Sequence, residues 1–329
     1  PYEGVVYDPC CGSAGMFVSS IKFVERHNGN RSKISIVGQE RIPDTWRLAK
    51  MNLAIRGIAH NLGERNESTF AEDLHKDKKV DFIMANPPFN LKDWRAENEL
   101  TDDPRWAGYE VPPKSNANYA WILNMIAKLS QNGVAGFILA NGALSGGGEE
   151  YKIRKQIIEN DLVEAILILP GSMFYSTDIS VSMWIVNRNK KARTVELNDI
   201  TKHYRDRSNE VLFFDLRREG VPFEKKFIEF DEETITKIAQ TYHAWQQVDF
   251  EENYTNIEEF CKSVSLDEIR KKDYSLVPSK FIDFKNVEEN FNFDEKMIEI
   301  TTELSSLFEQ ETALKQDVVN VFKSLGYEL

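Results

Sequence analysis

The chain has 329 residues, of which 41% are hydrophobic and 29% charged, as in an ordinary globular protein. A formal net charge of -12 excludes a strongly basic protein that holds nucleic acid by itself, because phosphate contacts need a positive face. No apolar run reaches the ~20 residues of a membrane span. The cysteines, Cys10, Cys11 and Cys261, form neither a disulfide framework nor a zinc motif. We therefore expect a cytoplasmic protein with no membrane span and no metal site.

Apolar, β-rich runs alternate with amphipathic stretches through the first part of the chain. In chain order they predict strand 4–8, helix 15–26, strand 34–40, helix 45–56, strand 81–85, helix 119–129, strand 134–140, helix 149–160, strand 163–169 and strand 181–186. Continuous apolar strands between helices indicate an α/β sheet covered on both faces. The last two strands are too close together for a helical crossover, so we predict an antiparallel pair at one edge.

The composition changes after Asn187. Basic residues are concentrated between positions 190 and 218, and beyond Glu219 the pattern is helical and acidic. The final segment spaces its apolar residues alternately by three and four, with one interruption at Glu311, which is a heptad seam. The seam consists of Met297, Ile300, Leu304, Leu307, Leu314, Val318, Val321 and Leu325. We therefore place an α/β domain at residues 1–218 and a helical C-terminal region at residues 219–329.

The segment Asn86-Pro87-Pro88-Phe89 directly follows a predicted strand, at the edge of the sheet where α/β proteins bind ligands. The prolines fix two φ angles, so a backbone carbonyl lies in a set direction beside the side-chain oxygen of Asn86. Two such acceptors suit an NH2 group, and holding both of its protons frees the nitrogen lone pair to attack an electrophilic methyl group. Phe89 offers a flat face to a base taken out of its stack. The alternative is a rigid turn that ends the strand.

A second motif, Asp8-Pro9-Cys10-Cys11-Gly12-Ser13-Ala14-Gly15, follows the first strand and opens a helix. Its small residues let a ligand approach the backbone closely, and free N–H groups at the helix start can bind a carboxylate. Glu40 ends the next strand, where an acid can accept hydrogen bonds from ribose hydroxyls. Asp73 precedes the Asn86 strand, where it can meet an adenine amino group. A solvated surface carboxylate is the simpler interpretation of each acid by itself, whereas the ordered set points to a nucleoside cofactor.

These motifs together closely resemble the modification (M) subunits of type I restriction-modification systems, which are N6-adenine DNA methyltransferases. The resemblance rests on the segments at 8–17, 38–40 and 86–89, and continues at 118–121, 153–155, 169–170, 174–177 and 274–280. It covers nearly the whole chain. It implies a Rossmann-like, S-adenosylmethionine-dependent methyltransferase sheet, with an antiparallel edge strand, as the catalytic domain at residues 1–218.

The resemblance also implies roles for individual residues. The methionine part of S-adenosylmethionine would be lined by Asp8, Pro9, Cys10, Gly12, Ser13, Gly15 and Met16. Glu40 would bind the ribose, and Asp73 with Leu74 the adenine of the cofactor. The catalytic, target-base site would consist of Asn86, Pro87, Pro88 and Phe89.

The partners implied by the resemblance are DNA and a specificity (S) subunit that recognises the DNA sequence. Residues 219–329 would dock on the S subunit through the terminal heptad, and a restriction (R) subunit is a further candidate partner. Docking explains how an acidic catalytic subunit acts on DNA. The heptad packing on its own domain is the alternative. The basic residues from Lys190 to Arg218 fit either DNA backbone contacts or a solvated surface ribbon.

Some positions depart from the family pattern. Ala14 stands where glycine is more frequent, Asn118 where aspartate is common, and Trp121 where phenylalanine is. The helical N-terminal domain of the family, and the aromatic segment that closes over the cofactor, would both precede Pro1. We therefore expect the chain alone to bind the cofactor poorly. Two other functions stay open: an Asn-Pro-Pro-type methyltransferase acting on protein glutamine or RNA, and a partner-binding scaffold without activity.

Overall fold

A nine-stranded mixed sheet organises the chain in the computed structural model, which describes residues 3–175, 177–197, 200–224, 226–284 and 293–324. The strand order is β13-β10-β6-β7-β5-β4-β1-β2-β3. Strands β5, β4, β1, β2 and β3 are parallel, whereas β7 runs antiparallel to both β5 and β6. Beyond β6, β10 is parallel to it and β13 is antiparallel to β10.

The elements have the following bounds. The strands of the large sheet are β1 (Gly4–Asp8), β2 (Ile34–Gly38), β3 (His60–Asn61), β4 (Val80–Ala85), β5 (Leu129–Ala140), β6 (Val163–Ile168), β7 (Val181–Asn187), β10 (Glu210–Asp215) and β13 (Cys261–Ser265). Two hairpins are formed by β8 (Arg193–Leu197) with β9 (Ile200–Tyr204), and by β11 (Val221–Phe223) with β12 (Phe227–Glu229). The helices are α1 (Gly15–Arg26), α2 (Pro43–Ile55), α3 (Asn118–Lys128), α4 (Gly148–Glu159), α5 (Glu232–Gln246), α6 (Leu266–Lys271) and α7 (Phe293–Ser324).

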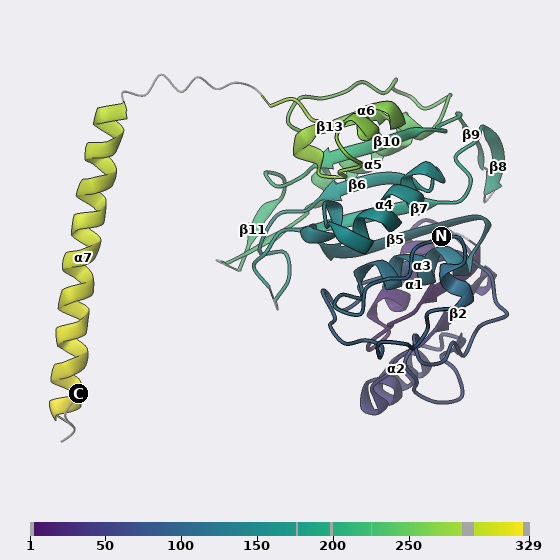
Figure 1. The fold of residues 1–329 in the computed structure, drawn as a ribbon, viewed down its shortest axis with the longest axis horizontal. Helices are drawn as coiled ribbons and strands as arrows, with labels where there is room; N and C mark the ends of the chain where they lie inside the picture. The colour runs from purple at the N-terminus through teal and green to yellow at the C-terminus, as the bar shows by residue number, and fades with distance from the viewer. Residues whose placement is uncertain (1–2, 176, 198–199, 225, 285–292, 325–329) are drawn as a thin grey trace. The chain divides into compact units, whose positions relative to one another are not determined.

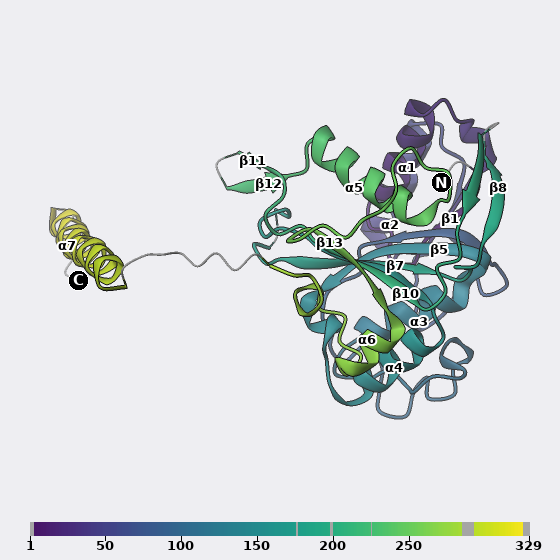
Figure 2. The ribbon, with the colours of Figure 1, turned by 90° about the horizontal axis from the view of Figure 1, so that it is seen from above.

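Side chains alternate between the two faces of the sheet, as the period of two in a strand requires. In β1, Val6 joins a core cluster with α1 and α2, and Tyr7 joins the cluster on the opposite face with α3 and α4. In β10, Leu212 packs in the cluster that contains Trp245 of α5, and Phe213 in the cluster of α3 and α4. Figure 2 shows α1, α2 and α5 on one side of the sheet and α3, α4 and α6 on the other. The predicted α/β sheet covered on both faces is confirmed.

Most of the predicted elements lie where the sequence places them. Strand β1 and helix α1 have the predicted bounds, and the other predicted elements agree within a few residues, apart from β5, which begins five residues earlier, at Leu129. The antiparallel pairing of β6 with β7 is confirmed. Its placement at the edge of the sheet is wrong, because β10 and β13 extend the sheet beyond β6 and leave β7 inside it (Figure 1). The antiparallel edge strand of the fold is β13.

Residues 219–284 contain more than the predicted helices. The segment holds the β11–β12 hairpin, α5, β13 and α6, and the sheet contact of β13 includes it in one compact unit, 1–284. The second unit is 285–329, whose described part is the 32-residue helix α7. The predicted boundary at 218/219 separates a catalytic part of the chain from a docking part. The division into compact units does not test this difference in function, so the boundary stays a prediction. Among the described residues, no helix has the length and apolarity of a membrane span.

A buried ion pair joins β6 to the loop before β10. Glu164 and Arg207 both have fully buried side chains, and Arg207 Nε donates to Glu164 Oε1 at 2.9 Å. The same carboxylate accepts hydrogen bonds from Gln246 at the end of α5 and from Asn187 at the end of β7. Three separate elements therefore depend on one carboxylate, whose buried charge forms an ion pair with Arg207.

We predict that Arg207→Met lowers the free energy of unfolding by about 3 to 5 kcal/mol, because Glu164 then keeps a buried and uncompensated charge. Urea denaturation of the variant and the parent chain measures the difference. Arg47→Met is the control, since Arg47 and its partner Asp44 have side chains 71% and 91% exposed, and it should change stability by no more than about 0.5 kcal/mol. Equal effects of the two substitutions would contradict the prediction.

Candidate cofactor and target-amine site

The turn after β1 is fixed by the last residue of the strand. Asp8 is buried, and its Oδ1 accepts a hydrogen bond from the backbone N–H of Cys10 at 2.9 Å. Backbone hydrogen bonds join Gln39 N–H to Asp8 O and Cys11 N–H to Gln39 O, which ties this turn to the end of β2. Burial raises the pKa of Asp8 to about 7, against the hydrogen bonds from Cys10, and the nearby Glu40 adds to the rise.

The backbone between this turn and α1 is unusually exposed to a ligand. Gly12 has a φ of +53°, which favours glycine, and Ala14 takes the same left-handed region with a φ of +67° although it carries a side chain. A Cβ built on Gly12 or on Gly15 would meet no atom within 4 Å. Open space therefore lies beside both glycines, where the N-terminus of a 12-residue helix begins.

Glu40 connects two of the predicted motifs. Its Oε2 accepts from the backbone N–H of Gly12 at 3.0 Å, and its Oε1 accepts from the backbone N–H of Ile42 at 2.8 Å. The side chain is half-buried. Each carboxylate oxygen has a further lone pair, so the group can still accept hydrogen bonds from a diol while the protein holds it in place.

Gln39 positions the third motif, a role that the sequence analysis did not assign. The side chain is fully buried, and Oε1 accepts from the backbone N–H of Leu74 at 3.2 Å. Nε2 donates to the carbonyl oxygens of Glu72 at 2.7 Å and Glu67 at 3.2 Å. One amide thus fixes the segment that carries Asp73 and Leu74 to the end of β2. Gln39 belongs to the Gly38-Gln39-Glu40 motif, so the sequence marks the position. Its role depends on tertiary contacts with residues 67, 72 and 74, which the sequence does not show.

Asp73 is engaged with a buried cation. Its Oδ2 lies 2.5 Å from Lys128 Nζ, and its Oδ1 accepts from the backbone N–H of His75 at 2.9 Å. Burial lowers the pKa of Lys128, although the carboxylate of Asp73 opposes that change. His75 is buried with Nε2 2.8 Å from the carbonyl oxygen of Gly38, so Nε2 carries the proton. No sequence pattern indicates Lys128 as the partner of Asp73, and a contact of Asp73 with adenine stays a prediction.

The remaining predicted cofactor residues lie on the same loops. The carbonyl oxygen of Pro9 accepts from Thr69 Oγ1, and the carbonyl oxygen of Ser13 accepts from Asn52 Nδ2 at 2.7 Å. Met16 is half-buried in the first turn of α1. Strand β1 pairs in parallel with β2 on one side and β4 on the other. The loops after β1, β2 and β4 therefore share one edge of the sheet.

The Asn86-Pro87-Pro88-Phe89 segment leaves β4 at that edge. Asn86 is exposed, and within the described residues its side chain makes no hydrogen bond. Pro87 is buried and Pro88 exposed. Phe89 is half-buried and packs against the core cluster of β6, β10 and α5. The structure thus presents a free amide beside a rigid, partly buried backbone.

A pair of asparagines holds the loop that follows Phe89. The backbone N–H of Asn90 donates to Asn118 Oδ1 at 3.0 Å, and Asn118 Nδ2 donates to Asn90 Oδ1 at 2.9 Å. Asn116 Nδ2 adds a third bond to Asn90 Oδ1 at 3.2 Å. Asn90 has a φ of +52°, a conformation that asparagine tolerates better than most residues. The buried Asn118, at the start of α3, thereby fixes the chain direction just beyond the target-amine motif.

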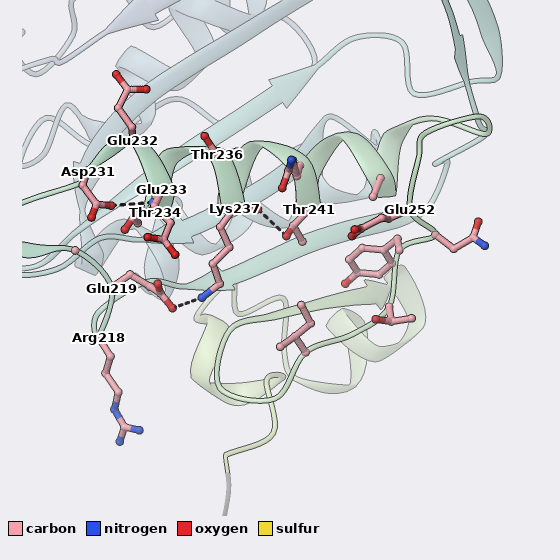
Figure 3. A pocket seen from close by; sticks show the side chains of 17 residues that line it. Arg218, Glu219, Asp231, Glu232, Glu233, Thr234, Thr236, Lys237, Thr241 and Glu252 are labelled. Carbon is pink, nitrogen blue, oxygen red and sulfur yellow. Dashed lines mark hydrogen bonds and ion pairs between the residues drawn. The ribbon is translucent and has the colours of Figure 1, made fainter.

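A pocket of about 850 Å³ lies elsewhere, between α5 and the segments at 218–220 and 252–257 (Figure 3). None of the predicted site residues lines it. Its acids outnumber its bases, and Lys237 Nζ is bound to Glu219 Oε1 at 2.8 Å. Such a lining does not suit an anionic ligand. Among the described residues, no three His, Cys, Asp or Glu side chains are grouped as metal ligands would be.

Most of the basic residues between positions 190 and 218 are paired within the protein. Lys190 is buried beside Asp161, and Arg205 lies 2.7 Å from Glu210. The other pairs are Arg207 with Glu164, Arg217 with Asp215 and Arg218 with Glu259. Arg193 is half-buried over the ring of Tyr204. Most of these basic residues therefore stabilise the loops and strands around β10, and few of them present an unpaired positive charge to a ligand such as DNA.

The strand order and the loops at one sheet edge define a Rossmann-like α/β domain of the S-adenosylmethionine-dependent methyltransferase class. Among solved structures, a type I restriction-modification methyltransferase subunit from Streptococcus thermophilus is similar, with a TM-score of 0.70 and 26% identity over 85% of this chain and 54% of that chain. Over residues 1–290 the sequence matches the family N-6 DNA Methylase. The chain belongs to this family.

Two curated relatives are close in sequence. The type I restriction enzyme HindI methylase subunit of Haemophilus influenzae is 44% identical over 330 residues, 100% of this chain and 70% of the relative. The MjaIX methylase subunit of Methanocaldococcus jannaschii is 36% identical over 328 residues, 98% of this chain and 56% of the relative. The chain thus spans between about half and 70% of the length of the proteins it resembles.

We predict that Asp8→Asn stabilises the protein at pH 8 by on the order of 4 kcal/mol relative to pH 4, compared with the parent chain. Between these pH values the unfolded chain has released the proton of Asp8 while the folded chain, with a pKa of about 7, still binds it. The contribution of Asp8 to stability therefore falls as the pH rises through that window. Asparagine keeps the acceptor for Cys10 N–H.

Urea denaturation of both chains across this pH range measures the effect. The difference in free energy of unfolding between variant and parent should grow steadily up to pH 7 and then level off. A difference that does not depend on pH would contradict the prediction.

Proposed function

We propose that this chain transfers a methyl group from S-adenosylmethionine to N6 of adenine in DNA, as the catalytic part of a type I modification subunit. The observation that carries the proposal is the exposed amide of Asn86 at the end of β4, next to the loop after β1, and this amide has no hydrogen-bond partner in the part of the chain that the structure describes. Membership of the N-6 DNA methylase family supports the reaction, and the relatives named as type I methylase subunits support the class of assembly.

The residues of the loops fit the cofactor. The open space beside Gly12 and Gly15 admits a ligand against the backbone, and the remaining lone pairs of Glu40 suit ribose hydroxyls. We assign the methionine portion to Asp8, Pro9, Cys10, Gly12, Ser13, Gly15 and Met16, the ribose to Glu40, and the adenine to Asp73 and Leu74. When bound, S-adenosylmethionine supplies an electrophilic methyl group on a sulfonium.

The chemistry assigned to this chain is mainly alignment. Asn86 Oδ1 and a backbone carbonyl of the proline segment accept the two protons of the amino group, which directs the nitrogen lone pair away from the ring plane. Phe89 provides the face on which the extruded base lies, and the Asn90–Asn118 pair keeps the loop in one conformation. No strong base is needed for the transfer itself, because the sulfonium leaves readily.

The C-terminal part is assigned to assembly. We propose that residues 219–329 dock on a specificity subunit through α7, whose apolar residues at heptad positions are exposed; they are Met297, Ile300, Leu304, Leu307, Leu314, Val318 and Val321. Leu325, the last predicted heptad residue, lies outside the described residues. The internal pairing of the basic cluster supports a partner that supplies the DNA contacts. A restriction subunit is a further partner of such an assembly.

We predict that Asn86→Ala lowers methyl transfer in the assembled complex by about 100-fold or more, because one of the two acceptors for the amino protons is lost. Cofactor affinity, measured by calorimetric titration, should stay within about 2-fold, and the free energy of unfolding within about 0.5 kcal/mol, since the Asn86 side chain has no hydrogen-bond partner among the described residues. Asn253→Ala, at an exposed position on the segment after α5, is the matched control. Unchanged transfer by the Asn86 variant would overturn the mechanism.

Incubation with labelled cofactor and DNA, RNA or glutamine-containing peptide separates the proposed substrate from its rivals. We expect label in DNA alone, at the adenine amino nitrogen. Label in RNA or peptide would replace the proposal with the Asn-Pro-Pro-type alternative. Loss of cofactor binding by the full-length protein would favour a scaffold.

We predict that Leu307→Asp combined with Leu314→Asp weakens association with the specificity subunit by about 100-fold or more, because two charges would enter an apolar seam. Ser306→Asp adds a charge outside the heptad positions of the same helix and should have little effect. Analytical size exclusion and calorimetry measure association. Equal association of all three proteins would contradict docking through this face.

A further inference from the structure

Two polar residues form a hydrogen bond where β5 ends and β7 begins, at the sheet edge that carries the target-amine motif (residues 86–89). Asn141 directly follows β5, and Ser180 directly precedes β7. Asn141 Nδ2 lies 3.3 Å from Ser180 Oγ, and Ser180 Oγ lies 2.6 Å from the carbonyl oxygen of Leu169. The two strands are antiparallel neighbours with Ala140 opposite Val181, so the pair continues their register by one residue.

The hydroxyl of Ser180 fixes the orientation of the Asn141 amide. A carbonyl oxygen only accepts, so the single hydroxyl proton of Ser180 goes to Leu169, and Ser180 can only accept from Asn141. The NH2 group of Asn141 must therefore face Ser180. This assignment follows from the hydrogen bonds and excludes the flipped amide.

The other end of that amide has no partner. Asn141 Oδ1 is buried, and it accepts no hydrogen bond within the described residues. A buried acceptor without a partner has lost its hydrogen bonds to water and gained none in the protein, so such a group calls for a specific reason. One N–H of the Asn141 amide donates to Ser180. The second N–H and Oδ1 lie side by side as the other edge of the amide, one donor and one acceptor for which the described residues supply no partner.

The position of this edge relates it to the target amine. Strand β5 pairs in parallel with β4, with Phe137 opposite Ala85, so Asn86 and Asn141 leave neighbouring strands at the same edge of the sheet. Phe89 packs against the same core cluster as Ile138, three residues before Asn141. A Cβ built on Gly142 would meet no atom within 4 Å, so space is open next to Asn141.

We propose that Asn141 binds the target base by its amino edge: Nδ2 donates to the adjacent ring nitrogen, and Oδ1 shares, in a three-centre hydrogen bond, one of the two amino protons that Asn86 and the backbone carbonyl accept. This inference rests on the proposed function and adds a specificity-determining residue to it. Asparagine forms such a two-point contact with adenine because adenine presents an N6 donor beside an N7 or N1 acceptor. Oδ1 is closed to solvent as the chain stands, so neighbouring side chains shift when the base enters.

The effect of replacing Asn141 on stability distinguishes a base-binding role from a structural role. Asn141→Leu removes an unpaired buried acceptor, so it should leave the melting temperature unchanged or raise it. The same variant should slow single-turnover methyl transfer by about 10-fold or more, while cofactor affinity stays within about 2-fold. Asn253→Leu, at an exposed position on the segment after α5, is the matched control.

The test uses the assembled complex with DNA carrying adenine, 7-deazaadenine or 1-deazaadenine at the target position. The parent complex should methylate the analogue that lacks the ring nitrogen bound by Asn141 about 10-fold more slowly than adenine. The Asn141→Leu complex, which has already lost this contact, should methylate the analogue and adenine at the same rate. Asn141→Asp keeps the size and an acceptor but loses the donor, so it too should not distinguish that analogue from adenine. It covers the case in which the leucine variant fails to fold.

Two outcomes overturn the inference alone: full transfer activity in Asn141→Leu, or equal slowing of parent and both variants by each analogue. A structural water on Oδ1 would produce the first of these. If the parent complex transfers no methyl group to adenine in DNA, the proposed function fails and the inference fails with it. The parent measurement therefore distinguishes the two failures.

Discussion

Parallel pairing of β1 with β2 on one side and with β4 on the other is the constraint on which the candidate site depends. Parallel strands must end at the same edge, so three loops distant in sequence become neighbours there. The hydrophobic alternation that buries Val6 and Tyr7 on opposite faces fixes this register, because a shift by one residue would exchange the two faces. The core thus determines which side chains can meet at the edge.

Side chains then hold these loops to one another. Gln39 and Glu40 each accept from a backbone N–H group of a neighbouring loop, and Asn118 does the same for the loop after Phe89, whereas Asp8 accepts from Cys10 within its own turn. These hydrogen bonds fix the conformation of the loops, while the carboxylate oxygens of Glu40 keep further lone pairs for a ligand. Loops held in this way keep their backbone conformation when a ligand binds, which favours alignment as the source of rate enhancement.

The sequence predicts those parts of the fold that depend on local pattern. Strand β1 and helix α1 are predicted with their bounds, because an apolar run, a glycine-rich turn and an amphipathic stretch follow one another directly. The position of β7 inside the sheet depends on β10 and β13, whose pattern is hidden among charged residues, so no local signal reports it. The order of the motifs predicts the site residues, but Lys128 meets Asp73 and Gln39 meets Leu74 through tertiary contacts, which spacing cannot supply.

The internal pairing of the basic residues around β10 has an electrostatic consequence for the proposed assembly. Binding to DNA is favoured by the entropy of the counterions that cationic side chains displace, and guanidinium groups already neutralised by Asp215, Glu164 or Glu210 displace few. In the assembly we propose, the steepness with which affinity declines as salt rises would then be a property of the partner subunit. The acidic chain would contribute to DNA binding by holding the extruded base rather than by contacts with the phosphate backbone of the DNA.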